Sequence, residues 1–199
     1  MADTETEQLQ KVTANPWAIQ YIKNPSLAVQ LAAVTREGIT IEFIDNPSER
    51  VKLAAATNDG EAIRFIPTPS EAVCLAAVTQ CGYVIEHIKN PSDAVKLIAV
   101  QVDGRSLYYI QNPSEELLLA AVKSNGWALK YIKNPSKDVA LIGLLKIIDR
   151  ADTKDTYYVK LVRTLLKRIY KQHPDWEELL IIADSSGIKL KSSSTDKAE

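Results

Sequence analysis

The sequence is poor in the side chains that most often carry chemistry. Among 199 residues it has two histidines, two cysteines and one methionine. It contains no H-E-x-x-H, C-x-x-C or G-x-S-x-G motif, so the common metalloprotease, redox and serine-hydrolase patterns are missing. The two cysteines, Cys74 and Cys81, supply two thiols where a structural zinc site prefers four ligands. We therefore predict that the chain is not an enzyme and binds no metal or cofactor.

Long apolar runs and an excess of charge are also missing. No stretch approaches the roughly 18 apolar residues of a membrane span, and the start, MADTETEQLQ, lacks the basic and apolar regions of a signal peptide. The formal net charge is −1, which gives no general attraction to nucleic acid or to anionic membranes. These absences favour a cytoplasmic protein with no membrane association and no disulfide framework.

What the sequence has in abundance is one short motif. YIKNPS at residues 21–26 returns as FIDNPS, FIPTPS, HIKNPS, YIQNPS and again YIKNPS. Its Pro-Ser pairs recur every 22 residues, at Pro25, Pro47, Pro69, Pro91, Pro113 and Pro135. Glycines keep the same period, at Gly38, Gly60, Gly82, Gly104 and Gly126. A fixed period over this many units is typical of a repeat architecture.

The residues within each unit predict two helices. Asparagine can cap the free N–H groups of a helix and proline suits its first position, so the Asn-Pro pair predicts a helix start. Acidic residues follow in several units and favour the positive helix end, at Glu49, Glu71, Asp93 and Glu115. The glycine that comes about 12 residues later can take the left-handed conformation that ends helices. An I-x-aromatic-I segment then predicts a second, shorter helix of about six or seven residues.

These features predict an all-α fold, a solenoid of stacked 22-residue helix pairs with a C-terminal helical cap. Each unit is too small to bury its own core, so neighbouring units must cover it. The expected segments are an N-terminal capping helix (1–14), an α-helical repeat array (15–149), C-terminal capping helices (150–187) and a disordered tail (188–199). Within the cap, residues 155–172 form an amphipathic helix, and a last helix starts at Pro174 or Asp175 and stops at Gly187.

The segment NPSEELLLAAVKSNGWALKYIKNPS, residues 112–136, resembles a family of short tandem helical repeats found in bacterial, phage and giant-virus proteins, catalogued as a domain of unknown function. The resemblance covers about residues 15–145 and rests on five units that repeat in register. It implies an all-helical repeat fold and a phage or bacterial setting. The family supplies no catalytic residues to carry over, so function must be inferred from surfaces.

The first surface feature is a column of rings in the short helices. The rings occupy one slot of the repeat, at Tyr21, Phe43, Phe65, Tyr109 and Tyr131, with His87 in the same slot. Four residues earlier, three units add Trp17, Tyr83 and Trp127, which α-helical geometry places one turn away on the same side. This side points away from the isoleucines that suit the core, so the rings lie at the core margin or on the surface. Either they pack between adjacent units, or they form a binding stripe.

The second surface feature is a basic helix face. Residues 154–172 hold six basic side chains against one acidic. Lys160, Arg163, Lys167 and Lys171 line one side with Arg168 beside them, opposite an apolar stripe. The face is either simply solvated or a site for an acidic partner or a nucleic-acid backbone. Residues 1–135 hold 12 basic and 15 acidic side chains, so no basic groove follows the array.

The predicted function is non-enzymatic: a helical-repeat scaffold that binds another protein, with an inhibitor or adaptor of phage or bacterial origin as the family-level expectation. The fifth full unit is the predicted site, because rings beside flexible cations suit a protein interface. Its candidate residues, with neighbours, are Trp127, Tyr131, Lys130, Lys133, Lys123, Tyr109, Lys160, Arg163 and Lys167. Two alternatives stay open: nucleic-acid binding through the basic C-terminal helix, and small-molecule or nucleotide binding at one end of the array.

Overall fold

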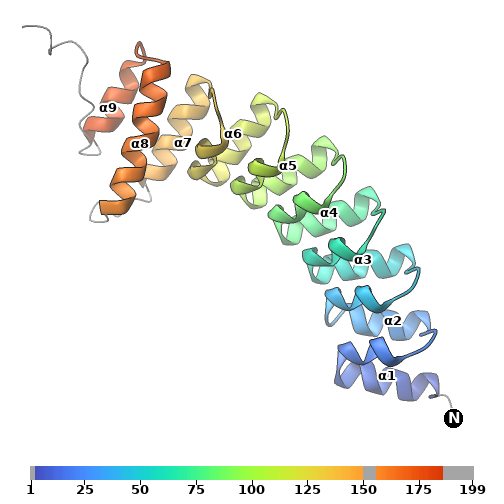
Figure 1. Ribbon diagram of the computed structural model, residues 1–199. Coiled ribbons are helices and arrows are strands. Elements are labelled where there is room, and N and C mark those ends of the chain that lie inside the picture. Colours follow the sequence, from blue (N-terminus) through green and yellow to red (C-terminus); the bar gives the residue numbers. More distant parts are fainter. Residues whose placement is uncertain (1–2, 150–155, 186–199) are drawn as a thin grey trace, which may run out of the picture. The chain divides into compact units, whose positions relative to one another are not determined.

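The computed structural model describes residues 3–149 and 156–185, and within these ranges the chain is helical and contains no strand. The prediction of an all-α repeat solenoid is confirmed, since within each of two units successive helices pack against one another in sequence order (Figure 1). The chain divides into two compact units, Met1–Ile110 (unit 1) and Gln111–Glu199 (unit 2). No helix in the described ranges is both long and apolar enough to cross a lipid bilayer.

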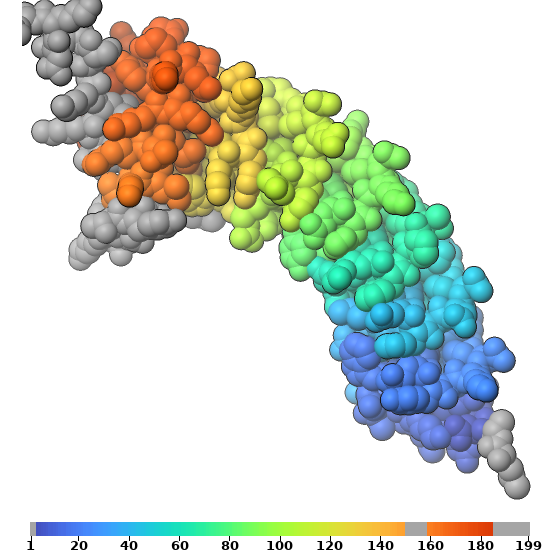
Figure 2. Space-filling model, in the orientation of Figure 1, coloured from blue at the N-terminus to red at the C-terminus, as the bar shows by residue number. Residues whose placement is uncertain are grey.

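Unit 1 alternates α-helices with short 3₁₀ helices, written η. Its elements are α1 (Glu5–Ala14), η1 (Pro16–Tyr21), α2 (Leu27–Val34), η2 (Gly38–Phe43), α3 (Glu49–Asn58), η3 (Gly60–Phe65), α4 (Glu71–Gln80), η4 (Gly82–His87), α5 (Asp93–Val102) and η5 (Gly104–Tyr109). In Figure 1, α1 to α5 form one row from blue to green, and the short helices form a second row beside it. The space-filling view shows these repeats packed without a break (Figure 2).

Unit 2 begins with one more helix pair and then departs from the pattern. Its elements are α6 (Glu115–Ser124), η6 (Gly126–Tyr131), α7 (Lys137–Asp149), α8 (Thr156–Gln172) and α9 (Glu177–Ser185). The amphipathic helix expected at residues 155–172 is α8, and the last predicted helix is α9, which begins two residues beyond Asp175. Gly187, its predicted stop, and the tail at 188–199, predicted to be disordered, lie outside the described residues.

The second helix of each pair has 3₁₀ geometry, which is tighter than the α-helical geometry assumed from the sequence. The reason is a spacing of three: in η4 and the residue after it, Gly82, Ile85 and Ile88 are all buried. A 3₁₀ helix has three residues per turn, so residues three apart line one side. The pattern G-x-x-I-x-x-I therefore places one continuous apolar edge against the core.

Each long helix of the repeat begins at the serine of the motif. The serine backbone is extended, and its hydroxyl accepts a hydrogen bond of 3.2–3.4 Å from the N–H three residues later, at Ser26, Ser70, Ser92 and Ser114. The prediction that asparagine caps this helix and that proline is its first residue was wrong. Proline instead precedes the cap, where its fixed φ suits an extended approach to the helix.

The motif asparagine has a different task. Asn24, Asn46, Asn90 and Asn112 have φ between 48° and 52°. Asparagine is one of the few residues other than glycine that adopts this left-handed conformation readily. It therefore makes the sharp turn from each of these short helices into the next long one.

The motif serines also link neighbouring repeats. The hydroxyl of Ser26 donates to Glu5 at 2.5 Å, across a sequence separation of 21 residues. The same bond recurs from Ser70 to Glu49, from Ser92 to Glu71 and, in unit 2, from Ser136 to Glu115. The prediction that acidic residues sit at helix starts is confirmed, and the structure adds this second role. Two motif serines lack this link. The residue 21 before Ser48 is Leu27, and Ser48 makes no side-chain cap. The residue 21 before Ser114 is Asp93, which pairs with Lys96 at 2.9 Å instead.

The repeat glycines end no helix, so the left-handed prediction was wrong. Gly38, Gly60 and Gly82 each begin a 3₁₀ helix, and none has a left-handed φ. A Cβ on Gly38 would lie 2.5 Å from the carbonyl oxygen of Ala55, and one on Gly60 would lie 2.5 Å from that of Ala77. Glycine is needed because each of these short helices runs directly against the α-helix of the next repeat.

The core between the two rows of unit 1 is built from small aliphatic side chains. One valine per long helix is fully buried, at Val29, Val51, Val73 and Val95. One alanine per long helix is equally buried, at Ala33, Ala55, Ala77 and Ala99. Small side chains let helices approach closely, so successive repeats stack with little volume between them.

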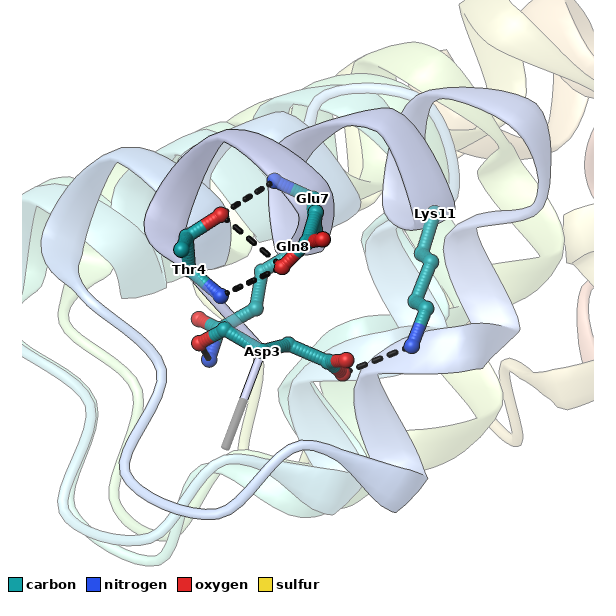
Figure 3. A network of polar contacts seen from close by, with 5 residues as sticks. All are labelled: Asp3, Thr4, Glu7, Gln8 and Lys11. Carbon is teal, nitrogen blue, oxygen red and sulfur yellow. Dashed lines mark hydrogen bonds and ion pairs between the residues drawn. The ribbon is translucent and has the colours of Figure 1, made fainter. Parts of the chain in front are cut away.

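Helix α1 forms the first end of unit 1 and starts with a complete capping box (Figure 3). The Glu7 N–H donates to the Thr4 hydroxyl at 3.4 Å, and the Thr4 N–H donates to the Glu7 carboxylate at 2.8 Å. These hydrogen bonds from Thr4 hold the pKa of Glu7 below its usual value. Lys11 pairs with Asp3 at 2.6 Å.

In unit 2, α8 is attached to η6 by long polar side chains. The Arg168 guanidinium donates to the carbonyl oxygens of Leu129 at 2.7 Å and Ile132 at 3.2 Å. Burial lowers the pKa of Arg168 from its usual value. Gln172 donates to the carbonyl of Lys133 at 3.2 Å. The sequence analysis placed Arg168 beside the exposed basic face, and this was wrong, because the side chain turns inward to these carbonyls.

Candidate protein-binding surface

The last residue of each 3₁₀ helix carries a ring, and in unit 1 these rings reach solvent. Tyr21 is 82% exposed, Phe43 38% and Tyr109 42%. His87 is also exposed, and Phe65 is half-buried. The prediction that this slot lies at the core margin or on the surface is confirmed for unit 1. We call the rings of η1 to η5 the aromatic row.

Some members of the aromatic row pack on their neighbours. Trp17 of η1 contacts Phe43 of the next repeat edge-to-face, with ring centroids 6.0 Å apart and planes at 70°. Arg64 lies over the ring of Phe65 at 6.0 Å. Packing between repeats and exposure therefore coexist. The prediction of packing between adjacent units is confirmed for Trp17 and Phe43, and the binding stripe stays a prediction.

Tyr83 is a further exposed ring of η4, and in 3₁₀ geometry it does not share a side with His87, four residues later. The Glu61 carboxylate of the preceding repeat is the main cause that raises the pKa of Tyr83 well above its usual value, and Cys81 adds to it.

The unit 2 candidates are partly separated by the 3₁₀ geometry. Four residues exceed one turn of such a helix, so Trp127 and Tyr131 do not share a side as the α-helical estimate predicted. Trp127 shares its side with Lys130, which is exposed, and Lys133 is exposed two residues beyond the end of η6. Trp127 itself is half-buried, while Tyr131 is 39% exposed.

The remaining predicted residues are all at the surface. Lys123 is exposed in the last turn of α6. On α8, Lys160, Arg163 and Lys167 are exposed on the side opposite buried Ile169. Tyr109 belongs to unit 1 and the other candidates to unit 2.

The histidines and cysteines form no cluster with the geometry of a catalytic or metal site. In the described part of the chain, no three His, Cys, Asp or Glu side chains are grouped closely enough to hold a metal ion. His87 pairs with Glu86 at 3.3 Å, and His173 stacks on Trp176 with centroids 3.8 Å apart. Cys74 is buried, which raises the pKa of its thiol.

Two surface features were missed from the sequence. Tyr108 is 67% exposed and packs edge-to-face on Tyr109, and two adjacent aromatic residues in the ring slot could have drawn attention to it. The second is a hollow of about 510 Å³ between α2 and α3, whose lining residues are Thr35, Arg50, Leu53, Ala54, Thr57 and Asn58. It opens where α2 ends early, and no sequence pattern pointed to it.

No protein-family model, curated protein or solved structure matches this chain. Membership of the tandem-repeat family named from the motif therefore stays a prediction. The surfaces described above are what supports a function.

Proposed function

We propose that this protein is a non-catalytic helical-repeat scaffold that binds another protein, and that the aromatic row of unit 1 makes the contact. The observation that carries the proposal is the exposure of large rings along one row of short helices, with Tyr21 and Tyr108 as the most exposed. Large exposed rings on a rigid backbone supply contact area at little entropic cost, and aromatic residues dominate the binding energy of many interfaces.

The charges of unit 1 favour a protein over a nucleic acid. Residues 3–110 hold nine basic and thirteen acidic side chains, an excess of four acidic groups. On and beside the short helices, exposed acidic residues (Glu42, Asp45, Glu86) are interspersed with exposed basic ones (Lys23, Arg64, Lys89, Arg105), so no basic track follows the row. A phosphate backbone needs such a track, whereas a protein partner can pair with charges of both signs.

A second candidate function, nucleic-acid binding, is favoured by one feature of unit 2. Lys160, Arg163, Lys167 and Lys171 are all exposed on one side of α8. Their partner would be an acidic protein surface or a phosphate backbone, and steep weakening of binding with salt would favour the latter. The resemblance of the repeat motif supports the further proposal of an inhibitor or adaptor role of phage or bacterial origin.

The test is site-directed photo-crosslinking in host lysate. A photoreactive phenylalanine placed at Tyr21 or Tyr108 should cross-link one protein band, because both side chains reach solvent from the aromatic row. The matched controls are Leu27 and Val102, which are each 45% exposed but lie on the long helices. Equal cross-linking from all four positions, or none from the aromatic row, would refute the proposed surface.

A further inference from the structure

The hollow between α2 and α3 is elongated and lies on the long-helix row of unit 1. Five of its six lining residues come from α3 and are three or four positions apart, so they form one stripe along that helix. The first and last of them, Arg50 and Asn58, are eight residues apart, which is about 12 Å along an α-helix. The volume of about 510 Å³ is within the roughly 300–1,000 Å³ of small-molecule sites.

Two hydrogen bonds fix one end of this hollow. The side-chain oxygen of Asn58 accepts from the Gly38 N–H at 2.8 Å, and the side-chain nitrogen donates to the Thr35 carbonyl at 2.9 Å. Both bonds run from the end of α3 to the turn that follows the early end of α2. The wall is therefore formed before a ligand arrives, so binding does not have to order it.

Arg50 is the one ionisable residue that lines the hollow. Its side chain is exposed, and within the described chain it makes no hydrogen bond or ion pair. The same slot of the repeat holds alanine in the other long repeat helices of unit 1, at Ala28, Ala72 and Ala94. The guanidinium is thus a departure from the repeat with no partner in the fold, and it favours an anionic ligand.

The charged residues nearest to the lining residues in sequence do not alter this preference. Glu49 accepts from the Ser70 hydroxyl of the next repeat, and Asp59 accepts from the Glu61 N–H at 2.9 Å. Arg36 and Glu37 follow Thr35 and have opposite signs. None of these four side chains lines the hollow, so the charge that a ligand meets inside it is that of Arg50.

The supply of hydrogen-bond donors decides which anion fits. The hydroxyls of Thr35 and Thr57 each donate to a carbonyl of their own helix at 2.7 Å, and the Asn58 amide is bonded through both its oxygen and its nitrogen. A phosphate has three acceptor oxygens and a charge of about −1.5 to −2, so it needs several donors. A carboxylate is satisfied by one guanidinium fork.

The walls favour a hydrocarbon body over a peptide. Leu53, Ala54 and the methyl groups of the threonines supply apolar contact. A peptide in the hollow would bury amide groups for which the lining offers few partners, and burying an unpaired amide costs free energy. A hydrocarbon chain has no such groups.

We infer that the hollow is a binding site for a small organic acid, a monocarboxylate with an elongated apolar body. The carboxylate pairs with the Arg50 guanidinium, and the body lies along Leu53 and Ala54 toward Thr57. This site is separate from the aromatic row, so it adds a ligand-binding function to the proposed protein-binding one.

The test is an NMR titration of the isotopically labelled full chain with octanoate. Octan-1-ol supplies the same body without the charge, and acetate supplies the charge without the body. Octanoate should shift the amide signals of residues 35–38 and 50–58 and bind at least tenfold more tightly than either control. Affinity should rise from butanoate to octanoate, because each added CH₂ buries more apolar surface, and level off for chains longer than about 12 Å.

Three variants test the assignment of Arg50 and the hollow. Arg50→Ala should weaken octanoate at least tenfold and leave octan-1-ol unchanged. Arg36→Ala is the matched control, since it removes an exposed charge that does not line the hollow, and it should change neither ligand. Leu53→Glu places a carboxylate in the hollow and should abolish octanoate binding. Leu53 is 38% exposed, so this variant should keep the helical circular dichroism of the unaltered chain.

Equal weakening by Arg36→Ala and Arg50→Ala overturns the inference, because it shows general charge attraction and no site. Shifts confined to residues outside the hollow overturn it too. So does tighter binding of octyl phosphate, or of a peptide that ends in Leu-Leu with a free carboxylate, than of octanoate. Cross-linking of the native partner from Tyr21 should be the same in Arg50→Ala as in the unaltered chain, so this test and that of the aromatic row can fail independently.

Discussion

The two units share one way of joining helices, and unit 2 adds a second. In both units a short helix meets the next long helix backbone to backbone, as at Gly60 against the carbonyl of Ala77 in unit 1 and Gly126 against the carbonyl of Gly143 in unit 2. In unit 2, α8 is in addition held to η6 by the long side chains of Arg168 and Gln172, which reach backbone carbonyls. A contact between two backbones can recur identically in every repeat, but it leaves no room for a Cβ on the glycine. A contact made by long side chains allows a helix of different length and sequence, such as α8, to pack at the end of the repeats.

The largest effect is expected from a variant that disrupts the close backbone contact between a short helix and the next long helix. In Gly60→Ala, the new Cβ would lie 2.5 Å from the Ala77 carbonyl oxygen, so one helix must shift. We expect a loss of about 3 kcal/mol in the free energy of unfolding, at the upper end for overpacking. Hydrogen exchange should quicken in α3 and α4 but not in α8.

The control for this variant is the adjacent Asp59→Ala, which removes only the cap that the Asp59 side chain gives the Glu61 N–H. It should cost about 1 kcal/mol. If Gly60→Ala costs no more than Asp59→Ala, the close approach does not limit the packing of unit 1.

Breaking the side-chain joint should have the next largest effect. Arg168→Leu leaves the carbonyls of Leu129 and Ile132 without their charged donor. We expect a loss of about 2 kcal/mol, as for a hydrogen bond from a charged group, and faster exchange in α8. Arg168→Lys keeps the charge but not the forked geometry and should recover only part of the loss. Unchanged exchange in α8 would show that apolar packing alone holds the cap.

A third variant tests the turns between the two rows of unit 1. Asn46→Ala places a Cβ residue without a side-chain amide at φ 48°, and it should cost about 1 kcal/mol. Asn46→Gly is the matched control and should be neutral within about 0.5 kcal/mol, because glycine adopts this conformation freely. Thermal melts of the three proteins suffice. Equal stability of the alanine and glycine variants would mean that the turn relaxes to another conformation.

The smallest effect is expected from a variant that adds the serine-to-carboxylate hydrogen bond missing at Ser48. Leu27 stands where other repeats have the acid that accepts from the serine 21 residues later, here Ser48. Leu27→Glu should add this hydrogen bond and a favourable charge at the helix start, together about 0.5–1 kcal/mol. Leu27→Lys, equally polar but of opposite sign, should not stabilise. A denaturant titration that ranks the lysine variant with the glutamate variant would disprove the link.

The repeat architecture could be predicted from the sequence because the 22-residue recurrence of the motif can be recognised without knowing which residue begins or ends each helix. The cap positions could not: asparagine and serine both cap helices, and proline is compatible with either register. The glycines misled for a similar reason, since the carbonyl that excludes a side chain at Gly38 belongs to Ala55 in the next repeat. The spacing of three between Gly82, Ile85 and Ile88 did indicate 3₁₀ geometry. In that geometry residues four apart, such as Trp127 and Tyr131, do not share a side.

The candidate site could be predicted only in outline. The ring slot was visible because its composition repeats, and its exposure in unit 1 followed from the position of the isoleucines opposite. The inward turn of Arg168 was not visible, because its acceptors are backbone carbonyls 36 and 39 residues earlier. Every residue has a backbone carbonyl, so the sequence does not show which of them will accept a hydrogen bond from a distant side chain. For the same reason, the effect of Glu61 in the preceding repeat on the pKa of Tyr83 could not be predicted from either segment alone.

The serine-to-glutamate link has a consequence for how such a protein changes length. Donor and acceptor are 21 residues apart at each link, so removing or duplicating one 22-residue module rejoins equivalent groups. Gain or loss of a module needs no redesign of the joint. Each module also brings one ring slot, so the number of modules sets the length of the aromatic row.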